Sequence, residues 1–249
     1  MLEWGKTMQE RSGFILREII QHYIESGLPV GSRLIARAPG VSLSSASIRN
    51  VMSDLEENGF LQQPHTSAGR IPTAKALKFY VDELLEEHEA KNAAMRGSTY
   101  FPDFSDAEEM MEYISLLLGN KTQQTSFVIF HRGQKKDSQK KVFYGCKSNI
   151  LNQPEFANVQ KVHRFLRALE EKEEFLNKMD TMNQGLNIKI GTENNIKGLE
   201  ECSLVASSYH LSQDELGMVG IIGPMRMDYI HMIDVVTATA HTLSKKLRQ

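Results

Sequence analysis

The sequence lacks the features that mark metal sites, membrane spans and exported proteins. It has only two cysteines in 249 residues, Cys146 and Cys202, with no CxxC pair and no histidine at ligand spacing. We therefore expect neither a zinc site nor a disulfide scaffold, and interpret both cysteines as small buried hydrophobic residues. No apolar run approaches the roughly 20 residues that cross a bilayer, and the start, MLEWGKTMQERSG, has no apolar signal-peptide region. These absences predict a cytoplasmic protein that does not enter a membrane.

An excess of positive charge, which nucleic-acid-binding domains usually show, is also absent, because the formal net charge is -2. The distribution of charge matters more than its sum. Residues 31–49 include Arg33, Arg37 and Arg49 and no acidic residue, whereas acidic residues cluster later, as in DELLEEHE from Asp82. A local basic face can therefore coexist with a mildly acidic whole.

Three helices are predicted at the N-terminus. Apolar residues recur at helical spacing over 10–26, and Gly27 ends the run. A second short helix fits 32–38, with Ser32 as N-cap and a break at Pro39 and Gly40. A third begins at Ser44 and stops at Gly59. Its apolar face carries Ile48, Val51, Met52 and Leu55, and its opposite face carries Ala46, Arg49, Asn50 and Ser53.

A hairpin follows the third helix over residues 60–72, with a polar turn around 65–69. Helix, helix, tight turn, helix and hairpin in this order are typical of a winged helix-turn-helix module. A long helix over 73–91 leads out of it. The polar stretch that follows predicts a domain boundary near residue 95, giving a DNA-binding domain over 1–95 and a second domain over 96–249.

The second domain mixes helices and strands. We predict a helix at 110–119, strands at 126–133 and 141–146 around a charged turn, and a long helix over 159–179. Three β-rich segments, 187–191, 202–209 and 216–223, precede a closing helix over 227–247. The fold class is therefore α+β, with a sheet covered by helices.

Six blocks along the chain carry a family resemblance. They are PVGSR from Pro29, SSASIRNVMSDLEENGFLQQPHTSAGRIPT from Ser44, YVDEL from Tyr80, NILNQPEF from Asn149, IGTENN from Ile190 and GIIGPMRMDY from Gly220. Together they resemble the heat-inducible transcription repressor family, HrcA. The resemblance implies a homodimeric repressor of heat-shock (chaperonin) operons that binds an inverted-repeat operator in double-stranded DNA. It also implies a chaperonin partner that keeps the repressor active, and a GAF-like α/β second domain with no ligand assigned.

The chain departs from the family pattern in its middle, where a short lysine-rich turn replaces a longer segment that includes an inserted dimerisation region. Two alternatives therefore stay open. One is an effector-sensing regulator, with an apolar pocket lined by the strands at 187–191 and 216–223. The other is a shortened paralogue that no longer represses by itself.

The residues expected to contact DNA lie in three places. In the third helix, exposed N-terminal side chains would reach base edges in the major groove, where Arg49 suits guanine and Asn50 suits adenine. Their alternative is an intramolecular bond to Asp54 or a cap. The turn of the hairpin suits phosphate or minor-groove contact, and the start of the second helix suits phosphate. The candidates are Ser32, Arg33, Ser44, Ser45, Ala46, Arg49, Asn50, Ser53, His65, Thr66, Ser67 and Arg70.

No residue pattern supports an enzyme, a cofactor site or a metal site. Glu193, Arg226 and Asp228 could be mistaken for catalytic groups, but Arg226 and Asp228 are better interpreted as a structural pair at a helix start. A two-fold operator requires a dimer, for which the second domain's helices are the candidates. Phe165 and Leu169 could belong to that surface, although core burial is the stronger interpretation for both.

Overall fold

The computed structural model describes residues 10–66, 68–91, 101–132, 139–212 and 215–248. The expected boundary near residue 95, most of the charged turn and Ser67 lie outside these ranges. The chain divides into two compact units, Met1–Ala90 and Lys91–Gln249, which we describe separately. None of the described helices combines the length and apolar content that a membrane span requires.

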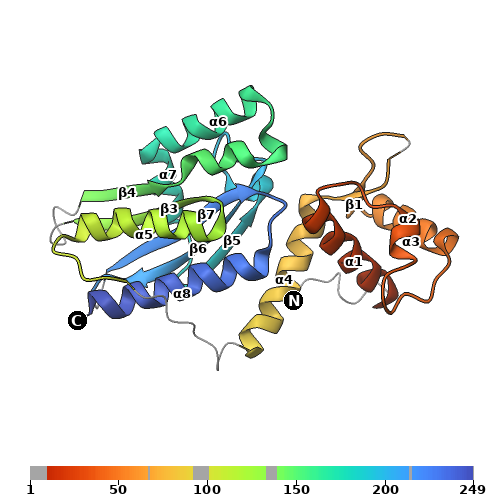
Figure 1. Cartoon of the computed structure of the whole chain (residues 1–249), viewed down its shortest axis with the longest axis horizontal. Helices are drawn as coiled ribbons and strands as arrows, with labels where there is room; N and C mark the ends of the chain where they lie inside the picture. The colour runs from red at the N-terminus through yellow and green to blue at the C-terminus, as the bar shows by residue number, and fades with distance from the viewer. Residues whose placement is uncertain (1–9, 67, 92–100, 133–138, 213–214, 249) are drawn as a thin grey trace. The chain divides into compact units, whose positions relative to one another are not determined.

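Unit 1 consists of helices and a small hairpin. Helix α1 (Glu10–Ser26) precedes the short α2 (Ser32–Ile35) and α3 (Ser45–Glu57), followed by strands β1 (Leu61–Gln62) and β2 (Ile71–Pro72) and by helix α4 (Ala74–Lys91). The strands pair antiparallel, with Leu61 opposite Pro72. Figure 1 shows α1, α2 and α3 as neighbours. Their contact side is apolar, with buried residues that include Ile15, Ile19, Ile35, Ile48, Met52 and Leu55.

Helix α2 is shorter than predicted. It ends at Ile35, before the Pro39 and Gly40 that were expected to break it. Its N-cap is Gly31 rather than Ser32, so that prediction was wrong. The physical reason is that the Ser32 side chain is buried and bonds to the next helix, which leaves it unable to cap its own.

Unit 2 is built on one five-stranded antiparallel sheet in the order β4-β3-β7-β6-β5. The strands are β3 (Thr125–Arg132), β4 (Gln139–Gly145), β5 (Leu186–Ile190), β6 (Cys202–His210) and β7 (Leu216–Pro224). The central strand β7 is buried along almost its whole length, as a strand covered on both faces must be. This α+β unit is consistent with the GAF-like domain that the resemblance implies.

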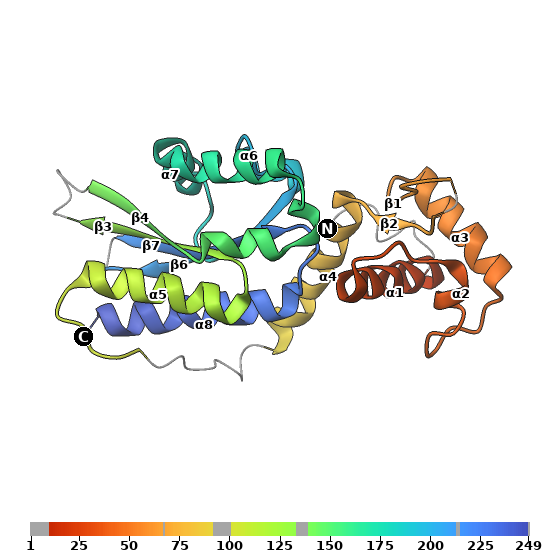
Figure 2. The same ribbon diagram turned by 45° about the horizontal axis from the view of Figure 1, so that its top comes forward.

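Helices cover both faces of this sheet, as Figures 1 and 2 show. Helices α5 (Ala107–Thr122) and α8 (Tyr229–Leu247) lie side by side on one face. Helices α6 (Val159–Glu170) and α7 (Lys172–Asp180) lie over the other. Short 3-10 turns at Lys147–Asn152, Pro154–Phe156 and Gly191–Asn194 complete the unit.

The prediction of one continuous helix over 159–179 was wrong, because this segment forms two helices. The chain turns at Glu171, whose ψ of 63° is not helical. The turn lets both helices bury aromatic residues in one core, where Phe165 and Phe175 are fully buried and Phe175 packs edge-on against Phe127. Leu169 is buried in the same cluster. Core burial is thus confirmed for Phe165 and Leu169, which do not form an exposed surface.

Candidate nucleic-acid interface

The exposed face of α3 carries the side chains that the sequence assigned to base contact. Ala46, Arg49, Asn50 and Ser53 are all exposed and recur at helical spacing. The opposite face is held in the core by Ile48, Met52 and Leu55. Neither Arg49 nor Asn50 has a side-chain hydrogen bond or ion pair with another described residue, so the alternative bond to Asp54 or to a cap is not present.

The N-terminus of α3 is capped and carries no acidic side chain. Ser44 is the N-cap, and its Oγ accepts a hydrogen bond from the Ser47 N–H at 3.1 Å. The first turn contains no acidic residue, although acidic side chains are favoured at such positions. The partial positive charge of this helix end is therefore left for an external anion.

A hydrogen bond between two serines joins α2 to α3. The Oγ atoms of Ser32 and Ser45 lie 3.0 Å apart, and Ser32 is buried. The bond links the start of α2 to the start of α3. Beside it, Arg33 and the neighbouring Arg37 are exposed, so cations lie on the short helix and its end as well as on α3.

The hairpin is tied to α3 through its base. Arg70 Nε donates a hydrogen bond to Glu56 Oε2 at 2.7 Å, and the two side chains are 21% and 32% exposed. Gln63 holds the polar tip of the hairpin, because its Nε2 donates hydrogen bonds to the carbonyls of Thr66 and Ala68 at 3.0 Å each. His65 and Thr66 are exposed at the tip.

Sequence reasoning missed two residues of this arrangement, Glu56 and Gly69. A Cβ on Gly69 would lie 2.4 Å from the carbonyl oxygen of Val30, so only glycine fits there. The glycine next to Arg70 was a usable signal, since glycine is the residue that allows a close backbone approach at a turn. Glu56 gave no signal, because its partner lies 14 residues away in the sequence.

The three residues of unit 2 that could resemble a catalytic set lie in separate interactions. Arg226 Nε donates to Glu155 Oε1 at 2.6 Å, and Asp228 caps α8 by accepting from the His231 N–H at 3.1 Å. The predicted pair of Arg226 with Asp228 was therefore wrong, because a carboxylate from a distant block takes the arginine. Glu193 Oε2 accepts from the backbone N–H of Ile190 at 3.2 Å.

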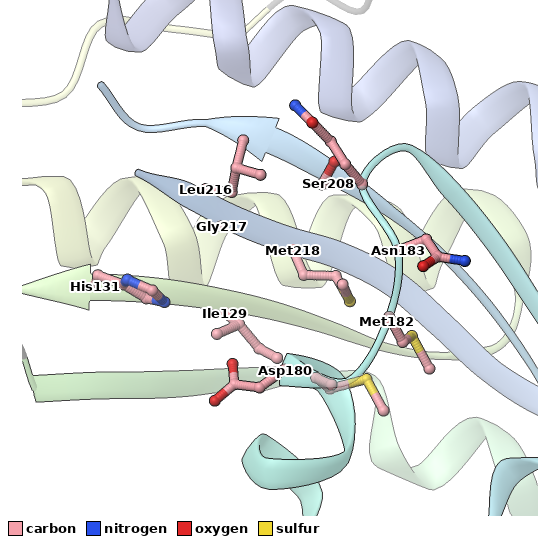
Figure 3. A pocket seen from close by; sticks show the side chains of 11 residues that line it. Ile129, His131, Asp180, Met182, Asn183, Ser208, Leu216, Gly217 and Met218 are labelled. Atoms are coloured by element: carbon pink, nitrogen blue, oxygen red, sulfur yellow. The ribbon is translucent and has the colours of Figure 1, made fainter. Parts of the chain in front are cut away.

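A half-open cavity of about 150 Å³ lies on the sheet of unit 2, at the end of α7 (Figure 3). Its lining includes Leu216, Gly217 and Met218 of β7 but no residue of β5, whose strand was expected to contribute. Ligand pockets usually measure about 300 Å³ or more. At its rim, burial and then the Lys140 charge lower the pKa of His131. This cavity gives the effector-sensing alternative little support.

The cysteines differ in burial. The predicted burial is confirmed for Cys202 and was wrong for Cys146, which is partly exposed because it lies just after the end of β4, with its Sγ 3.4 Å from Asn120 Oδ1. Burial raises the pKa of both thiols. Within the ranges that the structure describes, no cluster of three or more His, Cys, Asp or Glu side chains could hold a metal ion.

The fold and these surfaces define a two-unit α+β protein whose first unit presents an exposed helix face that carries Arg49 and Asn50. Residues 109–233 match the sequence profile of the HrcA protein C terminal domain. Because this match covers half of the chain, the protein belongs to the HrcA family.

Relatives match over nearly their whole length. The heat-inducible transcription repressor HrcA of Brevibacillus brevis is 28% identical over 334 residues, which cover 96% of this chain and 98% of that protein. The protein of the same name from Syntrophobacter fumaroxidans is 29% identical, covering 97% and 98%. An alignment of 334 residues is longer than this chain of 249, so the relatives contain segments that this chain lacks.

The fold also occurs in a solved structure. A crystal structure of a hypothetical protein superimposes with a TM-score of 0.78 at 20% sequence identity, covering 97% of this chain and 98% of that one. At this identity the likeness concerns the fold alone.

Proposed function

We propose that this protein is a heat-inducible transcription repressor, a negative regulator of heat-shock genes that binds an inverted-repeat operator as a homodimer. Unit 1 would be a winged helix-turn-helix domain in which α3 is the recognition helix and the β1–β2 hairpin is the wing. Such a repressor acts on the chromosome in the cytoplasm. The observation that carries the proposal is the exposed face of α3, on which Arg49 and Asn50 have no side-chain partner among the residues that the structure describes.

Each part of this surface has a chemical role. Arg49 and Asn50 can each form two hydrogen bonds with a purine in the major groove, worth on the order of 1 to 3 kcal/mol of base discrimination. Ala46 and Ser53 lie on the same face and would fit around a base edge. Arg33, Ser44 and Ser45 would position the helix end on a phosphate. At the wing, His65, Thr66 and Ser67 would contact the backbone or the minor groove.

The acidic C-terminal half of α3 limits the DNA-contacting surface to the first turns of the helix. Asp54 and Glu57 are exposed there and would face unfavourable repulsion from phosphates. A helix that reads only a few base pairs has low specificity, so a second copy on the second half-site is needed. We place regulation and dimerisation in the GAF-like unit 2, and chaperonin binding is part of the proposal.

The binding test compares a duplex carrying the family's inverted repeat with a scrambled duplex at fixed near-physiological salt, with chaperonin added and omitted. We expect preference for the repeat and a stoichiometry of two chains per duplex. Arg49→Ala should reduce this preference by about tenfold or more per half-site. Arg11→Ala is the matched control, because it removes the same charge from an exposed position on α1.

The outcomes separate the candidate functions. Equal weak binding of the wild-type protein to both duplexes in all conditions would reject the repressor and favour the shortened paralogue. If Arg49→Ala keeps the preference for the repeat, α3 is not the recognition helix.

A further inference from the structure

The base of the hairpin is fixed against two other segments of unit 1. The backbone of Arg70 pairs with that of Val30, with each N–H donating to the other's carbonyl at 2.8 Å. Gly69 packs directly on the Val30 carbonyl. The third tie is the Glu56–Arg70 bond to α3. The hairpin is therefore held from the loop before α2 on one side and from α3 on the other.

The carboxylate of this bond lies on the same side of α3 as Arg49. Glu56 is seven residues, two helical turns, after Arg49, so the two side chains project in nearly the same direction. An acidic side chain at this place would repel phosphates if it were free. It is instead paired with Arg70, and both side chains are mostly removed from solvent. The pair carries no net charge, and only 21% of the Arg70 side chain is exposed.

We propose that Glu56 and Arg70 form a positioning link that holds the hairpin tip at a fixed place beside the exposed face of α3. This inference rests on the proposed DNA-binding function and deepens it. Arg70 acts on DNA through the position of His65 and Thr66 at the tip, and not by touching a phosphate itself. It is therefore a positioning residue, and Glu56 is its partner.

The test depends on whether one substitution, Glu56→Gln, raises or lowers the affinity for DNA. By electrostatics alone, Glu56→Gln should tighten DNA binding, because it removes a negative charge near the phosphates and frees a guanidinium. A positioning link predicts the opposite: Glu56→Gln and Arg70→Gln should each weaken binding to the inverted repeat by on the order of tenfold. The double variant should be no weaker than either single one, because both substitutions remove the charge pairing of the same link.

Two further measurements, the salt dependence of DNA binding and the DNA footprint, distinguish a positioning link from a loss of protein stability. We expect Arg70→Gln to keep the wild-type slope of log affinity against log salt. We expect Glu56→Gln to lose protection of the DNA where the hairpin tip binds, while the protection of the major groove by α3 remains. Glu57→Gln is the matched control. Glu57 is exposed and forms no ion pair with a described residue, so its variant should bind as tightly as the wild type or slightly more tightly.

Two results of the DNA-binding measurements would overturn the link. One is unchanged or tighter DNA binding by Glu56→Gln. The other is a slope of log affinity against log salt that is smaller by about 1 in Arg70→Gln, which would make Arg70 a direct phosphate contact.

A measurement without DNA keeps the link testable if the wild-type protein shows no preference for the repeat, a result that would reject the proposed function alone. The amides of Val30 and Arg70 should then exchange hydrogen faster in Glu56→Gln than in Glu57→Gln. Equal exchange in the two variants would reject the link independently of DNA.

Discussion

The buried side chain of Asn194 gives a sharp stability prediction for unit 2, because it donates hydrogen bonds to three backbone carbonyls. Its Nδ2 donates to the carbonyl oxygens of Gly191, Leu199 and Cys202 at 2.8, 3.0 and 2.7 Å, and the residue is only 5% exposed. These bonds join the turn after β5 to the start of β6. Asn194→Asp keeps the shape of the side chain and removes every donor.

The magnitude follows from what the substitution leaves unpaired. The amide has two protons, so two full hydrogen bonds are lost, and each buried carbonyl left without a partner costs about 1 to 3 kcal/mol. The Leu199 carbonyl keeps the hydrogen bond that it accepts from the Cys202 N–H at 3.0 Å, so the cost falls on the carbonyls of Gly191 and Cys202. The Oδ1 atom accepts no hydrogen bond from the described residues, so a carboxylate would also find no donor for its charge. We expect a loss of about 4 kcal/mol or more, against a total stability of roughly 5 to 15 kcal/mol.

The assay is thermal unfolding of the full chain, followed by circular dichroism. For a unit of this size, about 4 kcal/mol lowers the melting temperature of unit 2 by roughly 10 °C. Asn177→Asp is the matched control, since Asn177 is exposed on α7 with no hydrogen bond to a described residue, and should change stability by less than about 0.5 kcal/mol. Equal melting of the two variants would refute the reasoning, because the carbonyls of the turn would then not depend on Asn194.

Three further predictions concern other parts of the chain. Ser44→Ala removes the N-cap bond of α3 and should destabilise unit 1 by about 1 kcal/mol in denaturant unfolding, whereas the exposed Ser42→Ala should not. Phe165→Ala should cost unit 2 about 3 to 5 kcal/mol because the ring is fully buried, and a cost no larger than that of the 38%-exposed Leu166→Ala would contradict this packing. The lowered pKa of His131 means that the unfolded chain binds more protons near the ordinary value of 6.5, so stability falls as the pH drops below that value; melting curves of His131→Gln should show a smaller fall.

Local signals in the sequence determined the helices that present the candidate site. The apolar spacing around Ile48 and Met52, the cap at Ser44 and the stop at Gly59 act within a few residues, and α3 runs from Ser45 to Glu57 between them. The exposure of Arg49 and Asn50 follows from the same periodicity. The strands of unit 2 were likewise predictable from β-rich segments, because hydrophobic patterning is a local property.

Tertiary structure decided which distant residues meet. Glu56 with Arg70, and Glu155 with Arg226, are pairs whose members lie 14 and 71 residues apart, and no local pattern links them. The break at Glu171 was also set by packing, since it lets Phe165 and Phe175 reach one core. A sequence determines how each segment prefers to fold, but charges and hydroxyls choose their partners only after the segments have packed together.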